Sequence, residues 1–253
     1  MQRPAPHEAP QIEPSGSWPH WRVPCVAMGP QSKAFVRKLL AWYRRNARDL
    51  PWRATRNPYA ILVSEFMLQQ TQVSRVTEFY PRFLARFPTL RALARSTPRA
   101  VREAWDGLGY YARASNLHAL ARVVRKTMEG KLPDDPLELR KLPGVGKYTA
   151  GAVACFAYEK PVPAVDTNVR RVLQRAFGNA KRGMPNAELW ELASALVPKN
   201  GKRAWRFNQA LMELGALVCK ARKPKCPECP VNSNCRTYTT RRSRRTAAVG
   251  LQA

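Results

Sequence analysis

A chain of 253 residues with 45% apolar side chains can bury a globular core, as one domain or as two small ones that share a cleft. Its 44 Lys and Arg against 17 Asp and Glu leave a formal charge of +27, which favours a polyanionic partner: nucleic acid first, then a ribosomal or acidic-lipid surface. No apolar run approaches the roughly 20 residues that cross a bilayer, and no signal-peptide core is present, so we expect a cytoplasmic protein without a membrane.

In chain order, residues 1–30 carry seven prolines and no helical apolar period, which predicts a disordered leader with Met28 as an alternative start. From Ala34 to Arg45, apolar residues at helical spacing predict an amphipathic helix with a basic outer face. Further periods between Pro and Gly turns predict helices at about 58–70, 73–86, 89–95, 98–106, 111–128, 136–141, 147–158, 168–177, 186–196 and 203–218. Strand patterns do not stand out, so we predict an all-α fold that ends in a basic disordered tail, residues 237–253.

Four of the six cysteines lie close together in the spacing C-x6-C-x2-C-x5-C: Cys219, Cys226, Cys229 and Cys235. In a reducing compartment, clustered thiols indicate metal ligands before disulfides. A [4Fe-4S] cluster takes one thiolate per iron. A four-cysteine zinc site is the alternative, but such sites often show two C-x2-C pairs and only one is present. We therefore favour the cluster, and we expect Cys25 and Cys155 to be free thiols.

A tight turn with two glycines, Gly144 and Gly146, joins two predicted helices, and Lys147 and Tyr148 open the second. Backbone N–H groups at such a helix start favour a phosphate. The turn could therefore hold a DNA backbone without reading sequence. A structural helix–helix turn could contain the same residues. The segment Val165–Val169, about twenty residues later, makes the pairing more specific.

At this point the chain resembles the helix-hairpin-helix glycosylase superfamily, and within it the adenine mismatch glycosylases of the MutY type. The similarity is carried by six motifs in the expected order: Leu50–Arg53, Ser64–Gln72, Gly107–Arg113, Leu142–Gly146, Val165–Asn168 and the four cysteines. The resemblance implies two all-α subdomains that flank a cleft for mismatched double-stranded DNA. One is a six-helix barrel with the hairpin, residues 58–163; the other is a [4Fe-4S] subdomain formed by both chain ends, residues 31–57 and 164–236. We expect a monomer associated with the nucleoid.

Two carboxyl groups suit the chemistry of this family, since cleaving a purine N-glycosidic bond requires a proton for the base and support for a cationic sugar. Glu65 lies within an apolar run, so burial would raise its pKa and keep it protonated as a general acid. The alternative to this catalytic role is a structural one, in which Glu65 is buried and held by a neighbouring Arg. The resemblance implies that Glu65 donates the proton to adenine. Asp166 precedes a helix and is predicted to cap it and to be ionised. The resemblance assigns it stabilisation of the sugar cation, with Asn168 as its hydrogen-bonding partner.

Tyr148 stands where relatives of the endonuclease III type, which also cut the strand, carry a Lys that forms a Schiff base. Lys147 does not replace that amine, because one residue along a helix turns the side chain by about 100°. The resemblance therefore implies a monofunctional enzyme. Tyr148 is also found in thymine-mismatch glycosylases, so it does not separate the two.

The resemblance also implies DNA-contacting residues. Gln70 and Tyr110 match an intercalating pair that fills the gap left by an extruded base. Trp52 and Gln209 match positions that line the adenine pocket, although packing in the core is the alternative for both. Phosphate contacts are expected from Arg113, Lys147, Arg170 and Arg171.

The resulting hypothesis is a base-excision enzyme that removes adenine opposite 8-oxoguanine or guanine. Full-length members of the family carry a C-terminal Nudix-like domain that helps recognise 8-oxoguanine, and we expect this chain to lack it. The rivals are a thymine or uracil mismatch glycosylase of the same superfamily and a DNA-binding module without catalysis. The cluster is expected to be structural, holding the basic loop 220–225 against phosphates.

Overall fold

The computed structural model describes residues 29–178, 183–240 and 242–243. These residues form α-helices and two short 3-10 helices joined by loops, and no strand element occurs among them. The all-α prediction is therefore confirmed. In this part of the chain no helix is both long enough and apolar enough to span a bilayer. The predicted leader lies outside the described residues up to position 28.

The helices follow the predicted periods closely, and the differences are confined to their ends. Their bounds are α1 Pro30–Asn46, η2 Pro51–Arg53, α2 Pro58–Leu68, α3 Val73–Arg86, α4 Leu90–Arg95, α5 Pro98–Ala104, α6 Ala112–Thr127, α7 Pro136–Arg140, α8 Lys147–Tyr158, α9 Thr167–Phe177, α10 Asn186–Leu196, α11 Gly201–Leu217 and η3 Asn232–Asn234. Helix α1 begins earlier than Ala34 because Pro30 is suited to a first helical position. Residues 236–240 are helical, so the predicted disordered tail does not begin at 237.

Side-chain caps explain why several boundaries could be located from the sequence. The Asn57 side chain accepts hydrogen bonds from the first backbone N–H groups of α2, and Thr89 and Thr97 do the same for α4 and α5. Asn200 caps α11 in the same way. Such caps satisfy donors that have no partner inside the helix.

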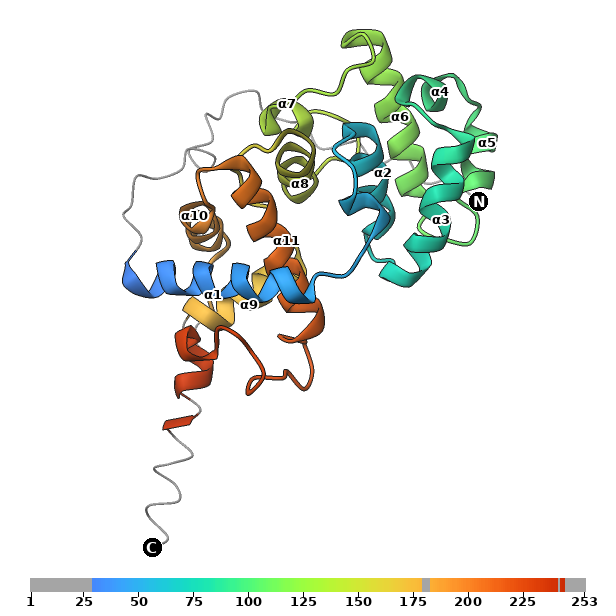
Figure 1. Ribbon diagram of the computed structural model, residues 1–253. Helices are drawn as coiled ribbons and strands as arrows, with labels where there is room; N and C mark the ends of the chain where they lie inside the picture. The colour runs from blue at the N-terminus through green and yellow to red at the C-terminus, as the bar shows by residue number, and fades with distance from the viewer. Residues whose placement is uncertain (1–28, 179–182, 241, 244–253) are drawn as a thin grey trace, which may run out of the picture.

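Helices α2 to α8 form one group and α1 packs with the later helices in another (Figure 1). Helix α2 contacts α3, α6 and α8, while α1 and α9 both contact α11. Every residue of α2 from Tyr59 to Met67 is buried. A helix that is buried all round lies at the centre of its group, so α2 carries Glu65 into the interior. The division at residues 58 and 164 stays a prediction, since α8 also contacts α11.

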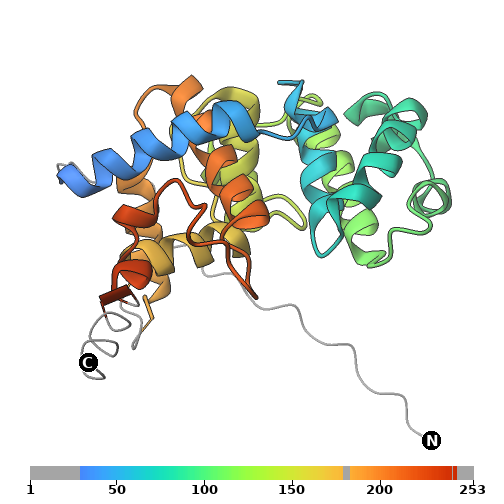
Figure 2. The same cartoon turned by 60° about the horizontal axis from the view of Figure 1, so that its bottom comes forward.

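The two ends of the described chain meet beside the cysteines. Helix α1 contacts η3 (Figures 1 and 2), Gln31 donates to the Asn234 carbonyl, and Lys38 Nζ donates to Ser233 Oγ at 2.7 Å. The group that carries the cysteines is thus built from both ends of the sequence.

Candidate active site and cysteine centre

Glu65 is a buried carboxyl group on α2, with only 3% of its surface exposed. Its Oε2 atom has no hydrogen-bond partner among the described residues. Burial raises its pKa to about 7; a hydrogen bond from Tyr148 opposes the shift and the charge of Asp166 adds to it. The predicted raised pKa is confirmed, and the protonated carboxyl has an oxygen left for a further partner.

Asp166 is the N-cap of α9, as predicted. Its Oδ1 accepts from the Val169 backbone N–H at 2.6 Å, and its Oδ2 accepts from Asn168 Nδ2 at 3.0 Å. Burial raises the pKa of Asp166, and these hydrogen bonds together with Arg171 partly offset the rise. The helix end favours the carboxylate as expected, but desolvation is the larger effect.

Tyr148 interacts electrostatically with the carboxyl groups of both Glu65 and Asp166. Burial, the charges of Glu65 and Asp166 and the hydrogen bond to Glu65 together raise its pKa well above the usual value. The phenol is therefore neutral and donates to Glu65. The structure brings Glu65, Asp166, Asn168 and Tyr148 into one site.

Arg171 connects this site to the cysteine segment. Its Nη2 donates to Asn168 Oδ1 and to the Gly215 carbonyl, each at 2.7 Å, and its Nε donates to the Cys219 carbonyl at 2.7 Å. These bonds point into the protein, so Arg171 is a structural contact and the expected phosphate role is not supported. A Cβ at Gly215 would lie 2.6 Å from Asn168 Cβ, so this glycine is required for the close approach of α11 and α9.

Trp52 and Gln209 are both buried near the start of α2. The Trp52 ring packs edge-to-face on Tyr80, with 5.6 Å between centroids, and Gln209 Oε1 accepts from Arg53 Nε at 2.9 Å. Sequence reasoning anticipated such core contacts as the alternative to a pocket role. The adenine-pocket role stays a prediction for both.

Glu213 is a fully buried carboxylate that sequence reasoning missed. It accepts from the Arg48 backbone N–H and Nε at 3.0 and 2.7 Å, and from Arg53 Nη2 at 2.7 Å. Burial alone would raise its pKa, but the hydrogen bonds from Arg48 and Arg53 outweigh this effect and hold it below the usual value. The network fixes the 3-10 turn that carries Trp52. Since Arg53 also bonds Gln209, it orients that amide as well.

Gln70 and Tyr110 occupy strained backbone positions in two separate loops, with φ of +56° and +47°. Tyr110 is 60% exposed, which is unusual for so large a ring. Arg113, expected at a phosphate, is instead only 7% exposed and donates to backbone carbonyls at the end of α2 and in both loops. The phosphate prediction for Arg113 is therefore wrong, because its guanidinium is used inside the protein.

The hairpin has the geometry that its glycines suggest. Gly144 has a φ of +73°, and a Cβ there would lie 2.7 Å from Asn116 Cβ, so the position requires glycine. Gly146 is the N-cap of α8 without a side-chain cap bond, and a Cβ there would meet only open space. Lys147 Nζ lies 4.1 Å from the centroid of the Trp190 ring, and desolvation lowers its pKa. The first turn of α8 is thus accessible at its N-terminus.

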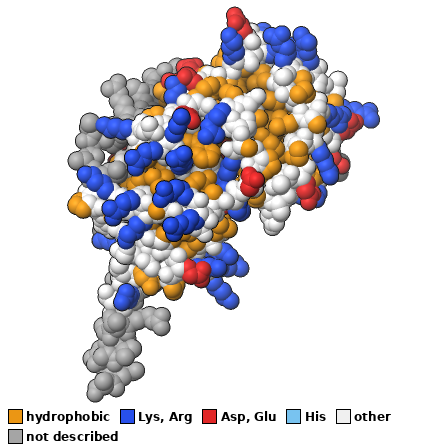
Figure 3. Space-filling view, viewed as in Figure 1, with side chains coloured by type: hydrophobic (Ala, Val, Ile, Leu, Met, Phe, Trp, Pro, Cys, Tyr) orange, Lys and Arg blue, Asp and Glu red, His pale blue; other side chains and the backbone are white. Residues whose placement is uncertain are grey.

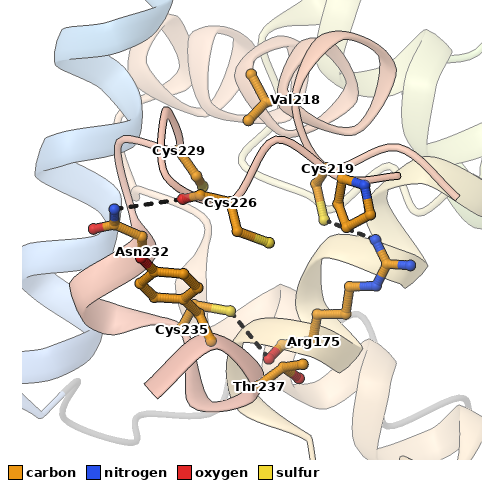
Figure 4. A pocket seen from close by; sticks show the side chains of 10 residues that line it. Arg175, Val218, Cys219, Cys226, Cys229, Asn232, Cys235 and Thr237 are labelled. Carbon is orange, nitrogen blue, oxygen red and sulfur yellow. Dashed lines mark hydrogen bonds between the residues drawn. The ribbon is translucent and has the colours of Figure 1, made fainter. Parts of the chain in front are cut away.

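The four cysteines of the predicted centre line a single pocket (Figure 4). No three His, Cys, Asp or Glu side chains in the described ranges lie close enough to hold one metal ion. Four thiols around one pocket match the donor set of a [4Fe-4S] cluster, in which each iron takes its own thiolate. Burial raises the pKa of Cys229 to about 11, and the neighbouring thiols add to the rise. Bound iron would offset the charge of the four thiolates, so the donor set suits this cofactor.

Arg175 lies at the edge of the same pocket (Figure 4). Its Nη1 donates to Cys219 Sγ at 3.4 Å and to the Lys220 carbonyl at 2.7 Å, and its own carbonyl accepts from Cys235 Sγ at 3.4 Å. Arg175 therefore fixes the start of the basic loop 220–225. The basic side chains of this loop are all exposed: Lys220, Arg222, Lys223 and Lys225.

Lys and Arg side chains also gather over the α1 half of the face shown in Figure 3, where acidic side chains are few. On α1 the exposed cations include Lys33, Arg37, Arg44 and Arg45. The opposite side of this helix buries Phe35 and Leu39. The predicted basic outer face of this helix is confirmed.

The fold and the site together define an all-α helix-hairpin-helix protein with buried catalytic-type carboxyl groups and a four-cysteine centre. Residues 63–198 match the family model of the HhH-GPD superfamily base excision DNA repair proteins, and residues 219–235 match that of the iron-sulfur binding domain of endonuclease III. The chain belongs to the HhH-GPD superfamily. The second match begins and ends at Cys219 and Cys235 and agrees with the predicted [4Fe-4S] cofactor.

The chain is also similar to individual proteins within this superfamily. The chain is 49% identical to an adenine DNA glycosylase of Mycobacterium tuberculosis over 196 residues, covering 77% of this chain and 64% of that protein. It thus spans slightly less than two thirds of that relative's length. A solved thermostable thymine-DNA glycosylase superposes with a TM-score of 0.78 at 36% identity, over 83% of this chain and 97% of that one. An endonuclease III trapped as a covalent intermediate with DNA gives a TM-score of 0.73 at 25% identity, over 85% and 99%.

Proposed function

We propose that the protein is a monofunctional DNA glycosylase that hydrolyses the N-glycosidic bond of adenine mispaired with 8-oxoguanine or guanine. One observation carries the proposal: the Glu65 carboxyl is buried, has a pKa near 7, and keeps one oxygen without a partner. A protonated carboxyl of this kind is suited to give a proton to a leaving base at neutral pH. The relative from Mycobacterium tuberculosis favours adenine as that base.

Binding would begin at the accessible N-terminus of α8 and the exposed basic loop 220–225, both of which favour phosphates. Their contacts would position the duplex without reading its sequence. The target base then has to leave the stack before its bond can be cleaved. We assign the filling of the gap to Tyr110 and Gln70, the two residues at positive φ.

Cleavage would follow from the two carboxyl groups. Glu65 donates its proton to the departing adenine, and the hydrogen bond with the Tyr148 hydroxyl helps to hold the Glu65 carboxyl group in place. Asp166 offers a carboxylate to the cationic sugar, oriented by Asn168 and by the N–H group of Val169. Water completes the hydrolysis. Because Tyr148 has no amine, the strand is left intact.

The [4Fe-4S] cluster would be held by Cys219, Cys226, Cys229 and Cys235. When bound, it supplies a rigid link among four points of the C-terminal segment. Arg171 and Arg175 bond the backbone at and beside the first ligand, so a bound cluster would also stabilise α9, the helix that Asp166 caps. The cluster takes no part in bond cleavage.

A thymine or uracil mismatch glycosylase is the second candidate. The specific observation in its favour is the thermostable thymine-DNA glycosylase, 97% of which is covered by the superposition. Tyr148 is compatible with both activities. The base itself therefore has to be identified by experiment.

The deciding assay uses four duplexes, with adenine opposite 8-oxoguanine, adenine opposite guanine, thymine opposite guanine and uracil opposite guanine. The purified protein is incubated with each, and alkali then cuts any abasic strand. We expect cutting at adenine only, and only after alkali. Cutting at thymine or uracil alone would establish the second candidate. If protein with its full iron content released no base from any duplex, the result would favour a DNA-binding module without catalysis.

We further propose that mismatched double-stranded DNA is the partner, that the protein acts as a monomer, and that it works in the cytoplasm at the nucleoid. The exposed cations of α1 and of loop 220–225 support the first point. The large apolar side chains that the described residues expose are few and scattered: Tyr110, Val123 and Leu137. Such a surface favours a monomer. Light scattering of the free protein and of its duplex complex tests this state.

A further inference from the structure

Arg113, near the start of α6, lies between the loop that follows α2 and the loop that precedes α6. Nη1 donates to the carbonyls of Phe66 and Met67, at 3.1 and 2.7 Å, and also to that of Gln69. Nη2 donates to the carbonyls of Leu108 and Gly109 at 3.2 and 3.0 Å. Nη1 thus bonds the end of α2 and the loop that follows it, and Nη2 bonds the loop that precedes α6.

The buried guanidinium is held by carbonyl dipoles. No ion pair with Arg113 is recorded among the described residues, and all its hydrogen-bond acceptors are backbone oxygens. Phe66 and Met67 lie in the last turn of α2, whose carbonyls have no partner within the helix and form the negative end of its dipole. Arg113 therefore caps α2 with a side chain from α6.

Both loops carry a residue in the left-handed region just beyond these bonds. Gln70 follows the Gln69 carbonyl with a φ of +56°, and Tyr110 follows the Gly109 carbonyl with a φ of +47°. Such conformations persist only where the surroundings impose them. Trp105 Nε1 adds a bond to the Gly109 carbonyl at 3.2 Å. On the side of Gln70, the guanidinium of Arg113 bonds the carbonyls of Phe66, Met67 and Gln69. Thr71 adds longer bonds to the carbonyls of Leu68 and Gln69, at 3.5 and 3.4 Å.

We propose that Arg113 is a positioning residue that sets the spacing of Gln70 and Tyr110, and that it acts on extrusion of the target base and not on bond cleavage. This inference rests on the proposed function, in which the two residues fill the gap left by that base. A planar fork with donors on separate nitrogens can tie two loops together. A lysine ammonium keeps the charge but concentrates its donors at one point and cannot bridge both loops.

The test compares Arg113→Lys with the unmodified protein on two substrates, under single turnover. One substrate holds adenine paired opposite guanine; the other holds adenine opposite an abasic site, where extrusion meets little resistance. We expect a loss of about a hundredfold on the paired adenine, since a misplacement of ~1 Å can have an effect of that size. On the unpaired adenine the loss should be smaller by at least about tenfold. Both rates come from the same preparation, so their ratio is independent of the fraction folded.

A second readout needs no bond cleavage. In a Glu65→Gln background, 2-aminopurine placed beside the target adenine should brighten when the duplex binds, and the added Arg113→Lys change should abolish that increase. Arg125→Met, at an exposed position of the same helix, serves as the matched control and should change neither readout. Equal losses on the two substrates, or an unchanged fluorescence increase, would overturn the role of Arg113. Failure of the unmodified protein to release adenine would instead count against the proposed function, and the fluorescence would still test the loops.

Discussion

Glu65 on α2 and Glu213 on α11 are both buried glutamates, yet their surroundings shift their pKa values in opposite directions. Glu213 accepts hydrogen bonds from Arg48 and Arg53, which hold its pKa below the usual value. Glu65 receives one hydrogen bond from a neutral phenol and feels the charge of Asp166, so burial raises its pKa to about 7. Burial alone therefore does not produce a general acid. What distinguishes Glu65 is that no Lys or Arg of the described residues forms an ion pair with it, whereas Glu213 pairs with two arginines.

The largest expected effect comes from removing the proton of the acid. Glu65→Gln keeps the shape of the side chain but cannot donate a proton to adenine, and we expect adenine release to fall by up to about 10⁴-fold. Single-turnover rates measure this loss, and gel-shift titration should show duplex binding within about threefold of the unmodified protein. An unchanged rate would remove Glu65 from the mechanism.

Glu213→Gln should affect stability instead. Removing one partner of a buried ion pair leaves a buried charge uncompensated, and the cost is typically about 3–5 kcal/mol. Denaturant unfolding measures it, with Glu188→Gln at an exposed site of α10 as the control. A cost below about 1 kcal/mol, the range typical of surface ion pairs, would mean that the network is not important to the fold.

The pH dependence should separate the two glutamates by sign. The pKa of Glu65 is about 7 in the folded protein, above its usual 4.5, so its stabilising effect is full below the usual value and is lost as pH rises through 7. The loss is on the order of 3 kcal/mol. Glu213 has a lowered pKa, so its contribution is lost as pH falls. In Glu65→Gln, the free energy of unfolding should not show this decline as pH rises towards 7. A decline identical to that of the unmodified protein would contradict the raised pKa of Glu65.

The smallest effect is expected from Tyr148→Phe. The Tyr148 hydrogen bond lowers the pKa of Glu65, so its loss should move the alkaline limb of the activity profile to higher pH. Rates of adenine release across the pH range measure the shift. A limb that moves to lower pH would show that the phenol does not donate to Glu65.

The sequence predicted those features that have a local signal. Apolar periods between proline and glycine turns located the helices, and the apolar run around Glu65 predicted its raised pKa. It did not reveal Glu213, because the partners Arg48 and Arg53 lie far away in the chain and only the tertiary fold brings them together. Arg113 was misassigned for a related reason, since a charge on a predicted helix gives no sign that carbonyls of two loops will surround it.

The same dependence on distant segments explains why Gly215 was missed and why Arg171 was misassigned. A lone glycine within a helical pattern is ambiguous in sequence, and its requirement becomes clear only when Asn168 is seen against it. Arg171 carries the positive charge expected of a phosphate contact. In the structure, however, its bonds to Asn168 and Cys219 join the catalytic segment to the cysteine segment.

The contact between α1 and α11 has a consequence for synthesis on the ribosome. Helix α1 is made before α11, and its buried face, with Phe35 and Leu39, packs against that later helix. Until then this apolar face stays exposed to solvent and to other nascent chains, a condition that invites aggregation. Helices α2 to α8 can meanwhile assemble as they emerge. Completion of the cysteine half, and with it iron loading, has to wait until α11 and the four cysteines have been made.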